Sequence, residues 1–495
     1  MKKNEKKVYP PLKSYYPKTI FLDDTIAAIS TPIGSSGIGI VRLSGKNTLS
    51  VADKIFVSSD GKRPRQFASH TLHHGWIVTG SQFTVHSSQK KKLTKSKPEV
   101  IDEVLLSVMR APKTYTREDI VEINCHSGIV VLKKILELIL KQGVRLAQPG
   151  EFTKRAYLSG RIDLAQAEAV LDVINSQTQE ALKAALGQLQ GKLSQRIKGL
   201  RRNLMNILTQ LEASIDFSDR DIEPETSREL LERMEDASCG LKELLDTADK
   251  GAILREGITC AICGKTNVGK SSLLNALLKK DRAIVTPVAG TTRDAVSGTL
   301  DLFGIPLRLI DTAGIIRPED LPTTEAVKKS RKCIKEASLA LFVLDASQRL
   351  SSEDLAASRD ISQKPAFVVL NKEDLPLNIT MNEAEKFLPG RKILRVSALC
   401  GSGLNRLKKE LADFIWQGKA GSNGQVLVTN IRHKQALKRA RKFLRRAIKA
   451  AKEEQSAEII ALDVKEAQAS LGEIIGRISC EDILGRIFSQ FCIGK

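Results

Sequence analysis

The residues whose types and spacing best suit chemistry lie in one glycine-rich segment, Gly264 to Ser271 (GKTNVGKS). The spacing is that of a phosphate-binding loop, and the segment stands between an apolar run and the helix-forming run Ser272 to Leu278. The glycines let successive N–H groups turn toward phosphate oxygens. Lys270 is expected to lie along the β and γ phosphates, and the Ser271 hydroxyl to bind Mg²⁺. The segment therefore predicts a nucleoside triphosphate site.

Two later segments carry groups that can respond to a γ-phosphate. Thr292, within residues 291–294 (TTRD), has a hydroxyl that can reach Mg²⁺ only when that phosphate is present. Asp311, within residues 311–314 (DTAG), ends an apolar run and can hold Mg²⁺ through water, while the Gly314 N–H can meet the γ-phosphate. We expect Asp311 and Lys270 to act in catalysis.

Two further segments predict which base is bound. Asp374 is the last residue of the segment 371–374 (NKED). Its carboxylate can accept two hydrogen bonds from the edge of guanine, whereas adenine presents an acceptor at that edge and is therefore disfavoured. Residues 397–399 (SAL) are expected to add a backbone N–H for the guanine oxygen. The glycine-rich segment and residues 291–294, 311–314 and 371–374 are together typical of a GTP hydrolase. The predicted nucleotide contacts are Asn267, Val268, Gly269, Lys270, Ser271, Ser272, Thr286, Pro287, Val288, Ala289, Gly290, Thr291, Thr292, Asp311, Thr312, Ala313, Gly314, Asn371, Lys372, Asp374, Ser397, Ala398 and Leu399.

Asn267 lies inside the phosphate-binding loop, although phosphate binding does not require an amide there. Its oxygen could bind a monovalent cation such as K⁺, which would put positive charge where other GTP hydrolases use an arginine. Equal GTP turnover in sodium and in potassium would contradict this hypothesis. The alternative is that Asn267 only caps the helix that follows.

The elements that position these segments are predicted by apolar periodicity. From Gly257 to about Trp416, short apolar strands alternate with helices, as in a doubly wound, mostly parallel sheet. The regular spacing of leucines and isoleucines over residues 182–215 predicts a long helical stripe, and helical periodicity returns at 431–454 and 465–476. We therefore expect an α/β plus α chain. Its expected parts are a basic extension (1–20), an α/β domain (21–158), a helical domain in two pieces (159–255 and 419–495) and a nucleotide domain inserted between them (256–418).

The composition restricts the class of protein. Lys and Arg outnumber Asp and Glu by 78 to 57, a formal charge of +21, which favours polyanionic partners such as nucleic acid or acidic lipid. No apolar run is long enough to span a membrane, so we expect a cytoplasmic protein with reduced thiols. Cys260 and Cys263 are expected to be small core residues on opposite faces of a strand rather than half of a zinc site.

The helix that begins near Arg432 has one apolar face, and ten Lys and Arg residues occupy the rest of its surface. Such a surface suits contact with RNA. It equally suits a face that is only solvated, and the sequence leaves both interpretations open.

At this point the chain resembles the tRNA-modifying GTPases of the MnmE (TrmE) type, from Asp24 to Lys495. The resemblance rests on the nucleotide motifs and on four segments: 33–45 (IGSSGIGIVRLSG), 115–128 (YTREDIVEINCHSG), 149–168 (PGEFTKRAYLSGRIDLAQAE) and 485–495 (GRIFSQFCIGK). It implies an N-terminal domain that binds 5-formyl- or 5,10-methylene-tetrahydrofolate, and an inserted GTPase domain activated by potassium-dependent homodimerisation. It also implies a flavin-dependent partner, with which the chain would add an aminomethyl or carboxymethylaminomethyl group to carbon 5 of the wobble uridine of certain tRNAs.

The resemblance also implies roles for single residues. Arg42, Glu122, Arg161 and Lys495 match folate contacts, although the family usually has Lys where Arg161 stands, and Arg differs from Lys in reach and geometry. Cys492 matches an essential thiol of the modification chemistry. The matches to metal ligands are Asn267, Thr286, Val288 and Thr291 for potassium, and Ser271 and Thr292 for magnesium.

One departure from the family concerns the residue that activates water. Thr323 stands where the family has a Glu, and Thr cannot act as that base at neutral pH. We expect Glu325 to take the role, or Glu319 or Asp320 to orient the water, with slower GTP hydrolysis than in the family. Fast turnover in a Glu325→Ala variant would contradict the role of Glu325.

Two competing functions fit the nucleotide motifs alone. One is a regulatory switch that binds RNA and reports the GTP level, and the other is a peripheral membrane GTPase that uses its positive charge on anionic lipid. The switch gives no reason for the folate-type segment or for residues 491–495, and no lipidation signal supports the membrane protein.

Overall fold

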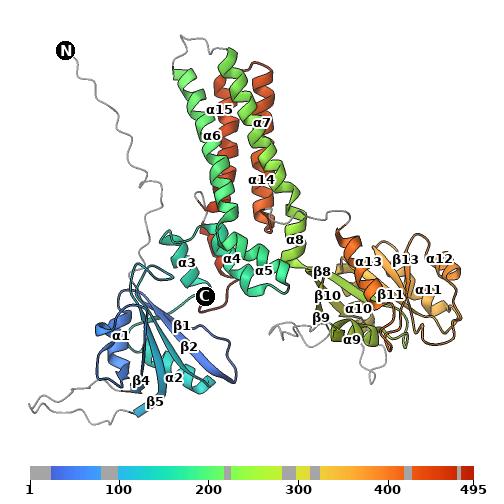
Figure 1. Ribbon diagram of the computed structural model, residues 1–495, viewed down its shortest axis with the longest axis horizontal. Coiled ribbons are helices and arrows are strands. Elements are labelled where there is room, and N and C mark those ends of the chain that lie inside the picture. Colours follow the sequence, from blue (N-terminus) through green and yellow to red (C-terminus); the bar gives the residue numbers. More distant parts are fainter. Residues whose placement is uncertain are drawn as a thin grey trace, which may run out of the picture. The chain divides into compact units, whose positions relative to one another are not determined.

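The computed structural model describes residues 24–79, 99–216, 224–280, 297–312, 324–416, 426–476 and 481–495. The chain divides into two compact units (Figure 1). The first comprises Met1–Leu171 together with Gly472–Lys495, and the second comprises Asp172–Leu471. The N-terminal extension and the Lys-rich segment near Lys90 lie outside the described residues.

The first unit is built on a seven-stranded sheet in the order β3-β4-β5-β6-β2-β1-β7. Neighbouring strands are antiparallel except for β1 and β7, which are parallel. Strands β2, β5 and β6 include the β-branched runs at 39–43, 104–109 and 120–124. The strands are β1 (Ile26–Ile29), β2 (Ser36–Ser44), β3 (Phe56–Ser58), β4 (Thr71–Thr79), β5 (Glu99–Met109), β6 (Ile120–Ser127) and β7 (Arg145–Leu146).

Helices α1 (Thr48–Ile55) and α2 (Ile129–Leu140) supply the apolar residues that cover one face of this sheet. Alternation along the strands turns Val41, Leu43, Val121 and Ile123 toward these helices, where they are fully buried. The unit continues through α3 (Glu151–Leu158) and the start of α4 (Leu164–Asn175), and ends with α16 (Glu481–Phe488). Helices α3 and α16 belong to one apolar cluster, so the C-terminal residues share a core with the segment around residues 151–171.

The second unit begins with helices. These are α5 (Gln179–Leu189), α6 (Lys192–Asp216), α7 (Pro224–Asp246), α8 (Ala248–Glu256), α14 (Ile431–Lys452) and α15 (Ala457–Ile475), of which the last reaches into the other unit. The helical stripe predicted over 182–215 is divided between two helices, because Gly191, with φ +82°, ends α5 before α6 begins. Leu193 to Leu211 are buried as expected, whereas Leu182 and Leu186 stay more than a third exposed. Helix α15 begins eight residues earlier than the predicted start at Lys465.

The second unit also contains a six-stranded sheet in the order β13-β12-β11-β8-β10-β9, which is parallel except for the hairpin between β9 and β10. Helices α9 and α13 supply apolar residues to the cluster on one face, and α10 and α12 to the cluster on the other. This confirms the predicted doubly wound sheet. The bounds are β8 (Ile258–Cys263), α9 (Lys270–Lys280), β9 (Ser297–Leu302), β10 (Ile305–Asp311), α10 (Thr324–Glu336), β11 (Leu339–Asp345), α11 (Ser352–Arg359), β12 (Ala366–Asn371), α12 (Met381–Phe387), β13 (Lys392–Arg395) and α13 (Leu404–Trp416).

Cys260 and Cys263 are both buried in β8, in the clusters on opposite faces of the sheet. Burial raises the pKa of the Cys263 thiol to about 12, and the nearby Lys270 ammonium opposes this increase. Burial also raises the pKa of the Cys260 thiol. Both residues are therefore protonated core side chains, as the sequence predicted.

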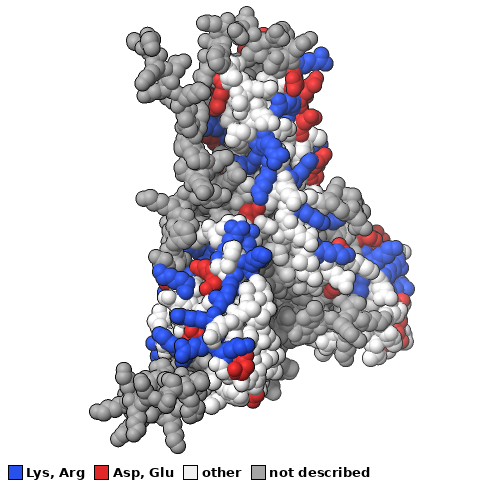
Figure 2. Space-filling view, turned by 60° about the vertical axis from the view of Figure 1, so that its left-hand side comes forward, with Lys and Arg blue, Asp and Glu red and all other residues white. Residues whose placement is uncertain are grey.

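Charged side chains are spread unevenly over the surface. On the face shown in Figure 2, Lys and Arg side chains predominate, and Asp and Glu lie in smaller groups among them. Within the described ranges, no helix combines the length and the apolar character that crossing a membrane requires.

Candidate functional site

The phosphate-binding loop follows β8, a strand that lies between β10 and β11 and whose last four residues are buried. Gly264 has φ +143° and Gly269 has φ +91°, conformations that side chains disfavour. A Cβ at Gly264 would also lie 2.3 Å from the Val343 carbonyl oxygen. The loop therefore requires glycine at both ends, and it leads directly into α9, whose N-terminus attracts anions.

Lys270 lies within the curve of this loop. Its side chain is buried, and its Nζ donates hydrogen bonds to the carbonyl oxygens of Gly264, at 2.9 Å, and Lys265. Burial lowers the pKa of Lys270, while the Asp311 carboxylate opposes the decrease. The loop thus positions a cation beside the backbone N–H groups that follow Gly264.

Ser271 and Asp311 bring two oxygen atoms together next to Lys270. The Ser271 hydroxyl donates to Asp311 Oδ2 at 2.5 Å, and Asp311 is 1% exposed at the end of β10. Hydroxyl and carboxylate oxygens are ligands that Mg²⁺ accepts, usually together with water and substrate phosphates. No cluster of three or more His, Cys, Asp or Glu that could hold a metal by itself occurs among the described residues. This pair therefore suits a metal that also binds the nucleotide.

The predicted base-reading segments meet at Asn371, which is buried at the end of β12. Its amide donates to the Val268 carbonyl at 2.9 Å, and its oxygen accepts from the Ala398 N–H at 3.0 Å. The Ser397 hydroxyl donates to Asp374 Oδ1 at 2.5 Å. One amide thus joins the phosphate-binding loop to the segment that holds the Asp374 carboxylate.

Lys372 has φ +66° and reaches back to β11, where its Nζ lies 2.6 Å from Asp345 Oδ2. Burial alone would raise the pKa of Asp345, but hydrogen bonds from Lys372 and Ser347 outweigh it and lower the pKa. Asp345 therefore remains ionised and holds Lys372 in place. Leu399, the last residue of the predicted base pocket, is 86% exposed.

Several predicted site residues lie outside the described part of the chain: Thr286, Pro287, Val288, Ala289, Gly290, Thr291, Thr292, Ala313, Gly314, Glu319, Asp320 and Thr323. Glu325 belongs to the first turn of α10, but its side chain is not among those described. Asn267, the one predicted potassium ligand within the described ranges, is exposed with φ +62°. Ser272 is exposed at the start of α9.

An ion pair that was not predicted from the sequence holds the phosphate-binding loop from outside. Lys265 Nζ lies 3.0 Å from Asp354 Oδ2, and the Asp354 side chain is 2% exposed. Ser351 and Asp354 form the capping box of α11. The Ser-x-x-Asp spacing of that box was the available signal, but nothing in the sequence pointed from it to Lys265.

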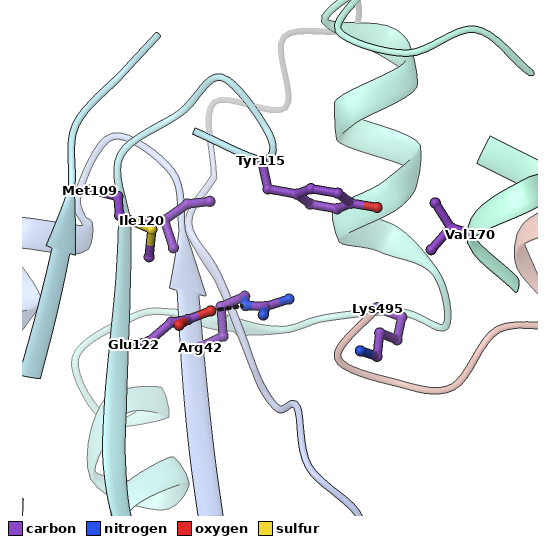
Figure 3. A pocket seen from close by; sticks show the side chains of 7 residues that line it. All are labelled: Arg42, Met109, Tyr115, Ile120, Glu122, Val170 and Lys495. Carbon is purple, nitrogen blue, oxygen red and sulfur yellow. Dashed lines mark hydrogen bonds and ion pairs between the residues drawn. The ribbon is translucent and has the colours of Figure 1, made fainter. Parts of the chain in front are cut away.

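A second candidate site is a pocket of the first unit (Figure 3). Arg42 of β2 and Glu122 of β6 are cross-strand partners, and Arg42 Nε lies 2.7 Å from Glu122 Oε1. Both side chains are about one-fifth exposed. The pocket offers a guanidinium, a carboxylate and an ammonium beside apolar walls. Its lining residues are Arg42, Met109, Tyr115, Ile120, Glu122, Val170 and Lys495.

Arg161 and Cys492 do not line this pocket. The Arg161 guanidinium stacks 4.8 Å above the ring of Tyr115, which does line it. Cys492 is exposed, and its carbonyl oxygen accepts from the Lys495 N–H at 3.3 Å. The sequence analysis missed Tyr115 as a pocket residue, although it begins one of the segments that carry the resemblance.

Lys495 reaches the pocket because the end of the chain is held by backbone contacts. The Lys495 carbonyl accepts from the Phe152 N–H at 3.1 Å, and the Gly494 carbonyl accepts from the Ser30 hydroxyl at 3.2 Å. Gly494 has φ +96°, and a Cβ there would lie 2.4 Å from the Ile29 carbonyl oxygen. The terminal turn therefore requires glycine at this position.

Comparison with known proteins gives matches along most of the chain. The family profile described as GTP-binding protein TrmE N-terminus matches residues 25–161, and the one described as MnmE helical domain matches residues 164–492. A tRNA modification GTPase MnmE from Alkaliphilus metalliredigens is 45% identical over 476 residues, which are 96% of this chain and 100% of that protein. The protein of that name from Enterococcus faecalis is 43% identical over 95% of this chain and 98% of its own. A crystal structure of an Aquifex aeolicus Era variant bound to GDP and AlF4⁻ is 31% identical, covering 38% of this chain and 66% of its own, with a TM-score of 0.27.

Proposed function

The chain belongs to the family of the tRNA modification GTPases MnmE, and on this premise we propose that it couples GTP hydrolysis to modification of carbon 5 of the wobble uridine in certain tRNAs. Membership makes it a GTP hydrolase involved in tRNA modification. The observation that best supports the nucleotide site is the bridge made by Asn371 between the phosphate-binding loop and the base-reading segment. A nucleotide bound there would meet phosphate ligands and a base-selective carboxylate together.

In the proposed site, the loop N–H groups and Lys270 would bind the β and γ phosphates. Ser271 and Thr292 would hold Mg²⁺, with Asp311 assisting through water, and the Gly314 N–H would contact the γ-phosphate. The short hydrogen bond between Ser271 and Asp311 fits such a metal, because both oxygens lie beside Lys270. When bound, Mg²⁺ neutralises charge that develops on the phosphates.

Two parts of the proposal concern how hydrolysis is accelerated. Potassium would be held by Asn267, Thr291 and the carbonyls of Thr286 and Val288, and equal turnover in sodium and potassium would contradict this part. Glu325 would orient the attacking water in place of the family's Glu, because it stands two residues beyond Thr323. Glu319 and Asp320 are the alternatives for that role.

We assign the pocket of the first unit to 5-formyl- or 5,10-methylene-tetrahydrofolate as a one-carbon source. Arg42 and Lys495 can pair with the carboxylates of such a ligand, and Glu122 can accept from its pterin N–H groups. Arg161 would act beside the mouth of the pocket through its stacking on Tyr115. Cys492 would contribute a thiol to the modification chemistry.

The remaining parts of the proposal concern assembly. We propose a homodimer that works with a flavin-dependent partner in the cytoplasm, and the domain limits 21–158, 159–255 with 419–495, and 256–418. Co-purification of tagged chain with a flavin-containing protein tests the partnership. Recovery of the chain alone, as a monomer, from cells that carry out the modification would contradict it.

The central test is nucleoside analysis of total tRNA from cells that lack this chain. We expect the modified wobble uridine to disappear, to return with the wild-type gene and to stay absent with Lys270→Ala, because the ammonium is needed at the phosphates. An unchanged nucleoside profile in the deletion strain would contradict the proposed function and favour a regulatory switch.

A further inference from the structure

Helix α14 has an unusual charge distribution. Its 22 residues include ten Lys and Arg and no Asp or Glu. One face is buried, because small and apolar residues recur at intervals of three and four. These buried residues are His433, Ala436, Leu437, Ala440, Leu444, Ala447 and Ala450. The basic residues therefore make up most of the helix surface that faces away from the bundle, beside the exposed Ile431 and Gln435.

Basic residues toward the margins of this surface have partners on neighbouring helices. Lys434 Nζ lies 2.5 Å from Asp249 of α8, Lys452 Nζ lies 2.7 Å from Glu235 of α7, and Arg446 pairs with Asp463 of α15 at 3.3 Å. Neighbouring helices can therefore account for these charges. The residues between them need a separate explanation.

Lys438, Lys442 and Arg445 lie along the middle of the solvent-facing surface, four and three residues apart, and are therefore neighbours on one helix face. All three are exposed. Within the part of the chain that the structure describes, they make no ion pair, whereas Lys449 one turn on pairs with Glu453 of its own helix end. We call Lys438, Lys442 and Arg445 the basic stripe.

The stripe weakens the helix that carries it. Like charges three or four residues apart destabilise a helix by about 0.2–0.5 kcal/mol per pair. Arg432 and Lys434 also lie in the first turn, where the helix dipole disfavours positive charge. A helix face that is only solvated does not need charges of a single sign. Helix α7, in the same bundle, carries both acidic and basic residues and contains the ion pair between Arg228 and Glu232. The stripe is thus better explained by an external anion than by solvation.

A repeated row of cations suits a polymer of phosphates. The seven helical rises from Lys438 to Arg445 span about 10 Å of helix, close to three steps of about 3.4 Å along one nucleic-acid strand. A membrane fits less well, because the apolar face of α14 is buried in the bundle and offers nothing to insert among acyl chains. Lys and Arg side chains also gather over the helical bundle on the face shown in Figure 2, with Asp and Glu along one edge.

We propose that the basic stripe of α14 is a docking surface for the ribose-phosphate backbone of the tRNA substrate. It positions the RNA without reading its sequence, since phosphates carry no base information. The inference rests on the proposed function only in taking tRNA as the substrate. It assigns that contact to the helical part of the chain rather than to either pocket.

The test compares two triple variants of the full-length chain. Lys438→Gln, Lys442→Gln and Arg445→Gln remove the stripe while keeping good helix formers. Lys328→Gln, Lys332→Gln and Lys335→Gln remove three exposed cations with the same spacing from α10 and serve as the control. Affinity for unmodified tRNA is measured by fluorescence anisotropy at several salt concentrations.

We expect the stripe variant to bind tRNA at least about tenfold more weakly, and the slope of log K against log salt to fall by roughly 2 to 3. The control variant should bind like the wild type, and GTP turnover without tRNA should be unchanged in the stripe variant. A charge-conserving variant, Lys438→Arg, Lys442→Arg and Arg445→Lys, should retain tRNA affinity, which separates loss of charge from loss of folding.

Equal tRNA affinity of the stripe variant and the wild type would overturn the docking surface and leave the proposed function intact. So would equal losses in the stripe and α10 variants. Loss of binding to phosphatidylserine vesicles with unchanged tRNA affinity would instead assign the stripe to a membrane. Failure of the wild-type chain to bind tRNA would also overturn the docking surface. The proposed function is tested separately, by nucleoside analysis of the deletion strain.

Discussion

Base recognition depends on how firmly the Asp374 carboxylate is held. The Ser397 hydroxyl donates to Asp374 Oδ1, and Asn371 fixes the neighbouring Ala398 N–H. A carboxylate oriented in this way can accept from two donors without first losing rotational freedom, which favours guanine over a base that presents an acceptor. The selectivity of the site is therefore expected to reside in one side chain and its positioning hydroxyl.

We expect Asp374→Asn to weaken GTP binding roughly 30- to 150-fold, about 2–3 kcal/mol, because an amide N–H would then face a guanine donor. Xanthosine triphosphate should bind to the variant more tightly than it binds to the wild type. Xanthine presents an oxygen at that edge, and this oxygen can accept a hydrogen bond from the asparagine amide. Calorimetry with both nucleotides measures the exchange, and Ser397→Ala serves as a control that should weaken GTP binding less. Unchanged preference for GTP in Asp374→Asn would show that another group reads the base.

At the scale of elements, the phosphate-binding loop and the C-terminal end of β12 are packed directly against each other. Gly269 lies against Asn371, so closely that a Cβ at Gly269 would come 2.3 Å from Asn371 Nδ2. Gly199 in α6 is the opposite case, because a Cβ there would meet no atom within 4 Å. The two glycines therefore differ in function: Gly269 belongs to the phosphate-binding motif, whereas Gly199 lies inside a helix.

Gly269→Ala should destabilise the second unit by about 2 kcal/mol or more, because it combines positive φ with a clash, and it should weaken GTP binding. Gly199→Ala should raise stability by about 0.5–1 kcal/mol, since alanine favours a helix interior over glycine. Urea unfolding of both variants, with GTP affinity measured in parallel, tests the pair. A Gly269→Ala variant with normal GTP affinity would mean that the loop adapts without Asn371.

At the scale of the whole molecule, the first unit is completed by the last residues of the chain. The Gly494 and Lys495 carbonyls accept hydrogen bonds from Ser30 and Phe152, and Lys495 lines the candidate folate pocket. The phosphate-binding loop belongs to the other unit. The two candidate ligands should therefore respond differently to removal of the C-terminal residues.

Deletion of residues 492–495 should lower the stability of the first unit by about 2–3 kcal/mol. It removes four hydrogen bonds to the rest of the chain, two of them long at 3.4 and 3.5 Å, and a typical bond contributes about 1 kcal/mol. Binding of 5-formyl-tetrahydrofolate should be lost, while GTP affinity is retained. Full-length Cys492→Ser is the control, because it keeps the backbone contacts and should bind folate normally. Normal folate binding by the truncated chain would remove Lys495 from the proposed pocket.

The elements followed from the sequence where their signals were local. The short apolar runs that predicted the doubly wound sheet lie at 259–263, 307–311, 340–345 and 366–371, and they agree with β8, β10, β11 and β12 to within two residues at either end. Strand β9 was not predicted, because Gly298 interrupts its apolar alternation and packs against Leu278 of α9. The break at Gly191 was missed because the leucine spacing continues across it.

By itself, the sequence determined the phosphate-binding loop, the base-reading segments and the two kinds of domain, because each depends on neighbours within a few residues. Tertiary structure decided which distant side chains meet. Strand register joins Arg42 to Glu122, the fold of α11 brings Asp354 to Lys265, and the terminal turn carries Lys495 to the pocket. These contacts depend on the packing of whole elements, and that packing leaves no mark in the local order of residues.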